Sequence, residues 1–231
     1  MPEEGLPWSN KKQLLSYEEM LRLVGILAKM GISKVRITGG EPFVRKDLMP
    51  FMADLSQIEG IEKLSITTNG TAPTRHIEAL KAMGIHAVNL SLDTLNKERF
   101  HKITRRDEFD QVINFYQSLI DAGIRTKINT VVMEEHNLED ILPLVELTQK
   151  DPVNVRFIEE MPFNGGSKGY QKIDWNYKKI LQLIAEKHPT IQKLDDHASS
   201  TSYNYQIPGA RGSFGVIPAY SRSICGTCDR I

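Results

Sequence analysis

Three basic residues lie inside stretches of sequence that otherwise have the composition of β-strands. Arg36 stands in KVRITGG, Lys127 in TKINTVVM and Arg156 in VNVRFIEE. A buried parallel strand is expected to be a nearly continuous apolar run, so a cation within one is costly unless it is paired. The partners could be carboxylates at the strand ends, namely Glu41, Asp93 and Glu160. We favour the other interpretation, in which the three cations point into the lumen of a βα barrel and bind a polyanion such as a triphosphate.

Small and hydrogen-bonding residues follow most of the expected strands. The clusters are Gly39–Pro42, Thr67–Gly70, Ser91–Thr94 and Glu159–Pro162. Each cluster alone is typical of a turn. Because ligands of parallel βα folds bind at the carboxyl ends of the strands, the clusters together favour a shared polar site.

Two cysteines, Cys225 and Cys228, form a single CxxC pair. Such a pair is compatible with half of a zinc site, a redox pair or part of an iron–sulfur site. Two thiolates cannot complete a four-coordinate metal, so further ligands must come from elsewhere. The histidines show no metal-ligand spacing, and the sequence assigns no catalytic residue.

A repeated pattern of helix, Gly-Ile and β-rich run predicts the elements that carry these residues. The four Gly-Ile pairs begin at Gly31, Gly60, Gly84 and Gly123. Glycine after a helix supplies the left-handed cap, and repeated αβ units predict a parallel sheet. The first helix has a capping box in Ser16 and Glu19. The strand that should precede this helix is missing from the sequence, so we expect an incomplete barrel.

The composition changes after residue 160. A helix is expected over 177–188, followed by short strands at 190–194, 203–208 and 213–220 that are antiparallel in character. We therefore expect an α/β chain of two regions. Residues 1–162 form the incomplete (βα) barrel, and residues 163–231 form a small α+β region that closes its mouth.

Overall composition narrows the class of protein. The 231 residues contain 29 Lys+Arg and 29 Asp+Glu, so the chain is formally neutral and does not have the character of a nucleic-acid or anionic-membrane binder. No apolar run approaches the ~18 residues of a membrane span. The acidic start of the chain is unlike a signal or transit peptide. A cytoplasmic location is expected by default.

The segment KVRITGGEPFVRKDL, residues 34–48, resembles the radical S-adenosylmethionine (SAM) enzymes. More narrowly, the chain is similar to the MoaA family, the GTP 3′,8-cyclases of molybdenum-cofactor biosynthesis. The similarity continues in order through LSITTNG, VNLSLDTL, KINTVVM, NVRFIEEMP and SICGTCDR. It therefore covers nearly the whole chain and depends on more than GGEP, which the whole superfamily shares.

The resemblance implies a radical SAM barrel and a role for each matching residue. The residues matching SAM-binding positions are Gly40, Glu41, Ser91 and Met161. Those matching GTP-binding positions are Arg36, Thr67, Lys127, Arg156 and Arg230. Cys225 and Cys228 match two of the three ligands of a C-terminal [4Fe–4S] cluster. The three cations first noted as a polyanion site thus coincide with the family's triphosphate positions.

The implied reaction converts GTP to (8S)-3′,8-cyclo-7,8-dihydroguanosine 5′-triphosphate. Reductive cleavage of SAM would yield a 5′-deoxyadenosyl radical that takes hydrogen from ribose C3′, and the carbon radical would attack C8 of guanine. The family's cofactors are SAM and two [4Fe–4S] clusters. Its implied partners are a second copy of the chain and a downstream MoaC-type cyclic pyranopterin monophosphate synthase.

Three features of the family are missing from this sequence. They are the CxxxCxxC motif of the first cluster, the third ligand of the second cluster, and the second arginine after the CxxC, which would follow Arg230. We therefore expect the chain to be part of a longer protein and to be inactive alone.

Two other functions remain open on the residues themselves. One is an aldolase-like βα-barrel enzyme in which Lys127 forms a Schiff base. The other is a non-catalytic nucleotide-binding fragment whose CxxC holds zinc.

Overall fold

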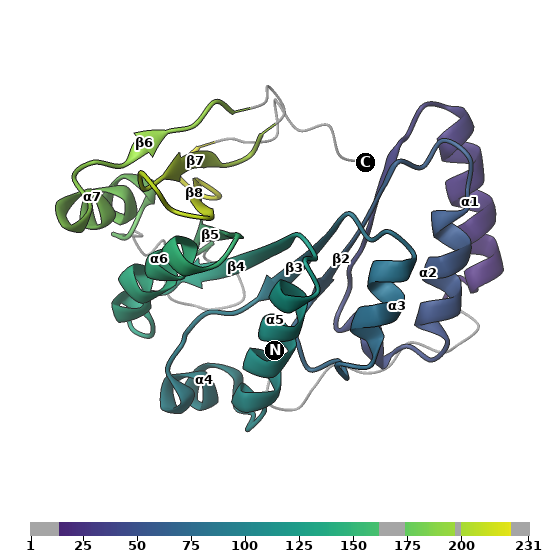
Figure 1. Cartoon of the computed structure of the whole chain (residues 1–231), viewed down its shortest axis with the longest axis horizontal. Helices are drawn as coiled ribbons and strands as arrows, with labels where there is room; N and C mark the ends of the chain where they lie inside the picture. Colours follow the sequence, from purple (N-terminus) through teal and green to yellow (C-terminus); the bar gives the residue numbers. More distant parts are fainter. Residues whose placement is uncertain (1–13, 162–173, 197–199, 223–231) are drawn as a thin grey trace, which may run out of the picture.

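A computed structural model describes residues 14–161, 174–196 and 200–222 of the chain. Within these residues, eight strands form one sheet in the order β1-β2-β3-β4-β5-β8-β7-β6 (Figure 1). The strands are β1 (Lys34–Ile37), β2 (Lys63–Thr68), β3 (Ala87–Ser91), β4 (Thr126–Val132), β5 (Val153–Glu159), β6 (Gln192–Lys193), β7 (Tyr203–Gln206) and β8 (Ser213–Ile217). Strands β1 to β5 are parallel, as the αβ repeat predicts.

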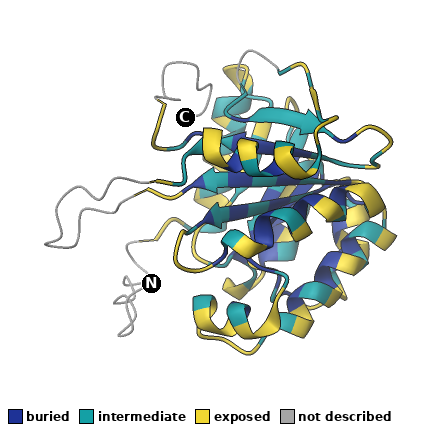
Figure 2. Cartoon of the chain, turned by 90° about the vertical axis from the view of Figure 1, so that its left-hand side faces the viewer, coloured by how far each residue is buried: buried dark blue, intermediate teal, exposed yellow. Residues whose placement is uncertain are grey.

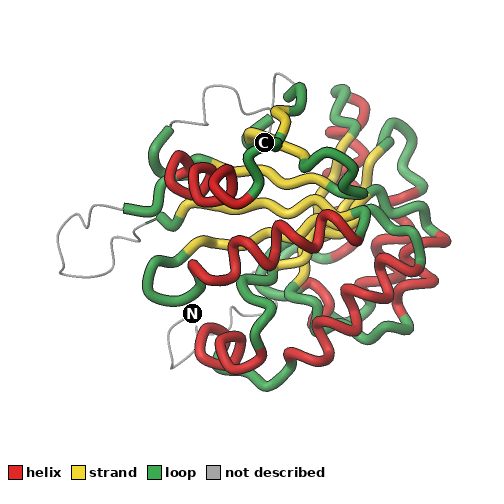
Figure 3. The backbone as a smooth tube through the Cα atoms, turned by 60° about the vertical axis from the view of Figure 1, so that its left-hand side comes forward, coloured by secondary structure: helices red, strands yellow, loops and turns green. Residues whose placement is uncertain are grey.

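The helices lie in the connections between the strands and pack along the sheet (Figures 1 and 3). They are α1 (Tyr17–Lys29), α2 (Leu48–Ser56), α3 (His76–Ala82), α4 (Lys97–Thr104), α5 (Phe109–Asp121), α6 (Ile141–Lys150) and α7 (Tyr177–Lys187), with short 3-10 turns η2 (Pro42–Val44) and η3 (Leu138–Asp140). The expected capping box of α1 is confirmed, because the Ser16 hydroxyl accepts from Glu19 N and Ser16 N donates to the Glu19 carboxylate.

The Gly-Ile pairs end helices as the sequence predicts. Gly31, Gly60, Gly84 and Gly123 all have positive φ, between 69° and 97°. At three of these helix ends the isoleucine N–H returns to a carbonyl five residues earlier, as in Ile85 N to Leu80 O at 3.1 Å. Gly31, Gly84 and Gly123 directly follow the C-caps of α1, α3 and α5 and turn the chain toward the next strand, whereas Gly60 lies in a separate turn three residues after Gln57, the C-cap of α2.

The two faces of the sheet differ in character. On β2, β4 and β5 buried residues alternate strictly with half-buried ones, and the buried set is mostly apolar. Leu64, Ile66, Ile128, Val155 and Phe157 are among these core residues. Figure 2 shows buried segments of the strands in dark blue. The helices pack on this apolar face, so the opposite face is left to the polar residues of the strands.

The C-terminal strands continue the same sheet. Strand β8 pairs in parallel with β5, whereas β7 is antiparallel to β8 and β6 antiparallel to β7. The expected antiparallel character is therefore confirmed for β6 and β7 but is wrong for the β5–β8 junction. In the described residues β1 and β6 stand at the two ends of the strand order, so hydrogen bonding does not close the sheet into a barrel. The fold is the expected incomplete α/β barrel.

Candidate functional site

Polar side chains form two adjacent rows across the face of the sheet opposite the apolar core. The first row, read through paired Cα positions from β2 to β8, is Thr67, Asn89, Lys127, Asn154 and Ser213. The second row lies two residues further toward the carboxyl ends and contains Ser91, Asn129, Arg156 and Gly215. Because side chains alternate along a strand, both rows point to the same side.

The three cations share this face. Arg36 pairs with Ser65 of β2, and Ser65 lies two residues before Thr67 in the first row. Lys127 and Arg156 occupy the two rows themselves. The sequence thus predicted their common face correctly, from alternation along each strand and from the expectation that helices cover the other face of the sheet.

The expectation that all three cations are buried is wrong for Arg36. Lys127 and Arg156 are half-buried, whereas Arg36 is exposed. The reason is that β1 is a short strand at the edge of the described sheet. It pairs with β2 on one side only, so the side chain of Arg36 has a neighbouring strand on that side alone.

Arg156 is held by its own strand. Its Nε donates to Asn154 Oδ1 at 2.9 Å, and Asn154 Nδ2 donates to Ser213 Oγ on β8 at 2.9 Å. The amide of Asn154 therefore links the guanidinium group to the neighbouring strand. The side chain of Arg156 is therefore already restricted before a ligand binds, which lowers the entropy cost of binding.

The glycine-rich turn after β1 is open on one side and anchored on the other. A Cβ added at Gly40 would meet no atom within 4 Å, and Gly39 has a φ of 152°. The Glu41 carboxylate accepts hydrogen bonds from the Thr68 hydroxyl, Asn69 N and Phe43 N at 2.8, 2.7 and 3.2 Å. Glu41 thereby fixes the turn to the end of β2 and leaves the backbone at Gly40 accessible.

The two other residues that match SAM-binding positions lie at strand ends. Ser91 is the last residue of β3 and is exposed. Met161 follows β5 with 46% of its surface exposed. Both are therefore accessible from solvent at the carboxyl end of the sheet, where the Gly40 turn also lies.

A half-buried acidic group lies just beyond Ser91. Asp93 Oδ1 accepts from Val131 N at 2.8 Å. Burial raises the pKa of Asp93 to about 6. The hydrogen bond from Val131 N opposes this shift, and the negative charge of the nearby Asp140 adds a smaller increase. Asp140 is itself buried and accepts from the Thr94 hydroxyl at 2.8 Å.

Sequence reasoning missed the asparagines of the two rows, Asn89, Asn129 and Asn154. Each occupies a polar position within a strand, and each is two residues from another polar residue of the site. That spacing was the available signal. Asn89 is buried, and its Nδ2 donates to Ile66 O at 3.2 Å.

Cys225, Cys228 and Arg230 lie outside the described residues. Among residues 14–161, 174–196 and 200–222, no group of three or more His, Cys, Asp and Glu side chains could hold a metal ion. Over the same ranges no helix is both long and apolar enough to cross a membrane.

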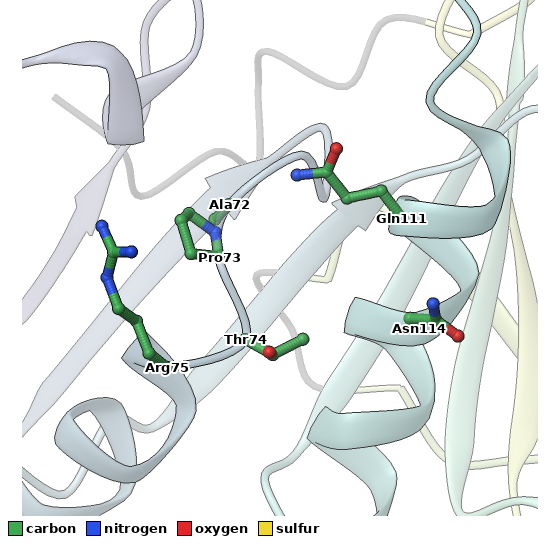
Figure 4. A pocket seen from close by; sticks show the side chains of 6 residues that line it. All are labelled: Ala72, Pro73, Thr74, Arg75, Gln111 and Asn114. Atoms are coloured by element: carbon green, nitrogen blue, oxygen red, sulfur yellow. The ribbon is translucent and has the colours of Figure 1, made fainter.

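A separate hollow of about 490 Å³ lies between α5 and the connection from β2 to α3 (Figure 4). It is lined by Ala72, Pro73, Thr74, Arg75, Gln111 and Asn114. Its rim is fixed by a 2.6 Å hydrogen bond from Gln111 Nε2 to Thr71 O. None of the site residues identified from the sequence lines this hollow, which belongs to the helix layer.

The residues present suit SAM better than they suit an iron–sulfur cluster. SAM offers an ammonium, a carboxylate and hydroxyl groups, for which the open backbone at Gly40 and the exposed Ser91 hydroxyl are suitable partners. A cluster needs thiolates, and the described residues contain none, since both cysteines of the chain lie beyond them.

Comparison with known proteins places the chain in a family. Residues 3–148 match the Radical SAM superfamily, and residues 153–231 match Molybdenum Cofactor Synthesis C. The whole chain is 40% identical to molybdenum cofactor biosynthesis protein 1 of Drosophila melanogaster, spanning 41% of that protein. It is 39% identical to the GTP 3′,8-cyclase of Heliobacterium modesticaldum, again over the whole chain, and spans 71% of that enzyme.

Solved structures support the fold. Streptococcus suis SuiB bound to S-adenosylmethionine aligns over 87% of this chain and 43% of its own, with a TM-score of 0.63 at 18% identity. Methylornithine synthase aligns over 74% of this chain and 52% of its own, with a TM-score of 0.59 at 20% identity. The matched sequence, the parallel sheet and the glycine turn after β1 agree: this chain belongs to the radical SAM superfamily and, within it, to the family of the GTP 3′,8-cyclases of molybdenum-cofactor biosynthesis.

Proposed function

We propose that the chain provides the SAM- and GTP-binding face of a GTP 3′,8-cyclase, which carries out the first step of molybdenum-cofactor biosynthesis. The observation that carries this proposal is the pair of polar rows on one face of the sheet. Thr67 and Lys127, assigned to GTP, lie in the first row, while Ser91, assigned to SAM, and Arg156, assigned to GTP, lie in the second. The two ligands would therefore lie side by side, as hydrogen transfer between them requires.

Each residue would contribute binding and orientation. Arg36, Lys127 and Arg156 supply positive charge for a triphosphate, and Thr67 supplies a hydroxyl in the same row. Gly40 leaves room for the SAM amino group, Ser91 offers a hydroxyl, and Met161 offers an apolar surface for the adenine. Glu41 acts here through the turn, because its carboxylate is already bonded to β2.

The cofactors carry the radical chemistry. With SAM bound, one electron from a reduced [4Fe–4S] cluster would cleave it to methionine and a 5′-deoxyadenosyl radical, which is the chemistry that the cofactors would supply for hydrogen removal from ribose C3′. The protein's share is to hold C3′ and C8 of guanine in reacting geometry and to exclude water from that face.

Further parts of the proposal concern the rest of the protein. Residues 1–162 would form the incomplete barrel, and residues 163–231 would carry Cys225, Cys228 and Arg230 over its mouth. Two [4Fe–4S] clusters, a homodimer, a MoaC-type synthase as the downstream partner and a cytoplasmic location belong to the same proposal. Membership of the radical SAM superfamily favours a triphosphate partner for Lys127 over a Schiff base.

GTP binding by the purified chain tests the proposal directly. Calorimetry should show that Lys127→Ala and Arg156→Ala each weaken GTP binding by roughly tenfold or more, since each removes a charge-assisted contact. Lys34→Ala is the matched control. Lys34 lies on β1 two residues before Arg36, on the same face but nearer the amino end, so its loss should change affinity little. Equal effects at Lys34 and Lys127 would indicate nonspecific charge attraction and contradict the proposed site.

A further inference from the structure

The end of β3 separates from β4 directly after Ser91. Ser91 pairs with Asn129 in the last aligned position of the two strands, and Leu92 N donates to Asn129 O at 3.1 Å. Strand β4 continues to Val132. Backbone groups that lose their partners in a sheet must find others or carry a cost in free energy. The two strand ends therefore need hydrogen-bond partners from elsewhere in the chain.

The side-chain amide of Asn137, which precedes η3, supplies such partners to both strand ends. Its Nδ2 donates to Asp93 O and to Val131 O, both at 2.8 Å. Its Oδ1 accepts from Met133 N at 2.8 Å. Asn137 is only 2% exposed, and both hydrogens of its amide group are used in this way. The amide thus bridges β3 and β4 where the backbone hydrogen bonds between them end.

Two further hydrogen bonds hold the same segment. The Thr130 hydroxyl donates to Leu92 O at 2.7 Å, and the Asp93 carboxylate accepts from Val131 N at 2.8 Å. Thr130 and Leu92 are each 1% exposed, so solvent has little access to these groups. Beyond Leu92 N, side chains thus replace the backbone hydrogen bonds between the two strands. Among these side chains, that of Asn137 is the one that comes from outside both strand ends.

We propose that Asn137 is a positioning residue for the SAM site, because it holds the end of β3 on which Ser91 lies. Ser91 is exposed and is the last residue of β3, so fraying of residues 92 and 93 would reach it first. A hydroxyl that is held in place before a ligand binds loses less entropy on binding. This inference rests on the proposed function, in which the Ser91 hydroxyl contacts SAM. Asn137 is buried and acts only through Ser91.

The carboxyl group of Asp93 reports on this segment without SAM, GTP or cluster. Burial is the largest cause of its raised pKa of about 6, the Val131 hydrogen bond lowers the pKa, and the charge of Asp140 raises it by a smaller amount than burial does. Asn137→Ala removes both donors and the acceptor, so water should reach the Asp93 carboxyl group. Its pKa should therefore fall to about 4–5, as measured by carbon-13 NMR titration.

Two companion variants make the comparison specific. Thr130→Val keeps the shape of the side chain and removes its hydroxyl, so it should lower the pKa of Asp93 in the same direction by a smaller amount. This milder variant decides the question if Asn137→Ala does not fold. Tyr116→Phe is the matched control, because it removes a 2.7 Å hydrogen bond between a buried side chain of α5 and Asp151. It should leave the pKa of Asp93 at about 6.

Calorimetry connects the same segment to SAM, in a longer protein that also carries the family's CxxxCxxC motif. Asn137→Ala should weaken SAM binding by roughly fivefold, because the Ser91 hydroxyl must then be ordered when SAM binds. Tyr116→Phe should leave the affinity unchanged. In a Ser91→Ala background the Asn137 substitution should have little further effect, because the hydroxyl that it positions is gone.

The outcomes separate this inference from the proposed function. A pKa of Asp93 that stays at about 6 in both Asn137→Ala and Thr130→Val would overturn the inference. An equal fall in Tyr116→Phe would assign the effect to general loss of stability and would also overturn it, as would an unchanged SAM affinity in Asn137→Ala or losses at Asn137 and Ser91 that simply add. Failure of the unaltered longer protein to bind SAM would instead contradict the proposed function.

Discussion

The carboxylate of Glu41 and the hydroxyl of Thr68 are joined by a 2.8 Å hydrogen bond across 27 positions of sequence. Glu41 follows β1, and Thr68 is the last residue of β2. Through this bond the end of β2 fixes the glycine turn whose open backbone would face SAM. A residue that matches a SAM-binding position is therefore also a structural link between two strands.

Thr67 and Thr68 are adjacent but should differ in their effects. Thr68 is buried, and its hydroxyl donates to Glu41 and accepts from Gly70 N. Thr68→Val should therefore lower the free energy of unfolding by about 1–3 kcal/mol. Thr67 is half-buried on the polar face, so Thr67→Val should leave stability nearly unchanged and weaken GTP binding. Urea unfolding measures the stability of both variants, and calorimetry measures their affinity for GTP. A loss of stability in Thr67→Val together with a loss of GTP affinity in Thr68→Val would show that Thr68, and not Thr67, lies on the ligand-binding face.

Substitution of Gly40 should affect the ligand and spare the fold. An added Cβ there meets nothing within 4 Å, and the backbone lies outside the positive-φ region. Gly40→Val should keep the melting temperature of the chain and abolish SAM binding by a longer protein that also carries the family's CxxxCxxC motif. Gly25→Ala, within α1 and equally open, is the control. It should raise stability by about 0.5–1 kcal/mol and leave SAM binding intact. Unchanged SAM affinity in Gly40→Val would remove this turn from the site.

Asn154 should act on GTP only through Arg156. Asn154→Ala removes the acceptor of Arg156 Nε and the link to Ser213, so GTP binding should weaken several-fold. The same change in an Arg156→Ala background should have little further effect, because the group it orients is gone. A double-mutant cycle followed by calorimetry measures the coupling. Additive losses would show that Asn154 contacts the ligand by itself.

Asp93 should make stability depend on pH. Its pKa in the folded chain is raised to about 6 from the model-compound value of 3.8, so the folded state holds the proton more tightly than the unfolded state. The penalty for burying the charge is absent below about pH 4, grows between about pH 4 and 6, and is complete above that range. Asp93→Asn should therefore stabilise the chain at pH 8 by up to about 3 kcal/mol and hardly at all at pH 4. Denaturant unfolding across this range checks the sign, and a gain independent of pH would contradict it.

The local elements of the fold were predictable because their signals are short-range. The Gly-Ile pairs mark helix ends through backbone conformation, and the Ser16–Glu19 capping box depends on residues three apart. Alternation along a strand likewise placed Arg36, Lys127 and Arg156 on the polar face without knowledge of their neighbours. Sequence similarity added the family and the role expected of each matching residue.

Pairing between strands decided what the sequence could not. The sequence predicted antiparallel strands after the helix at 177–188, yet β8 joins β5 in parallel and adds Ser213 to the first polar row. Register between distant strands brought Asn89, Asn129 and Asn154 into line with the cations. Asn137 resembles any asparagine in a turn, yet its amide bonds to the backbone of Asp93, 44 positions earlier in the chain. The sequence by itself determined the elements, the polar face and the family, because these depend on local backbone preference and on motif. Only the tertiary structure decided which side chains meet, because such contacts depend on packing between residues far apart in the chain.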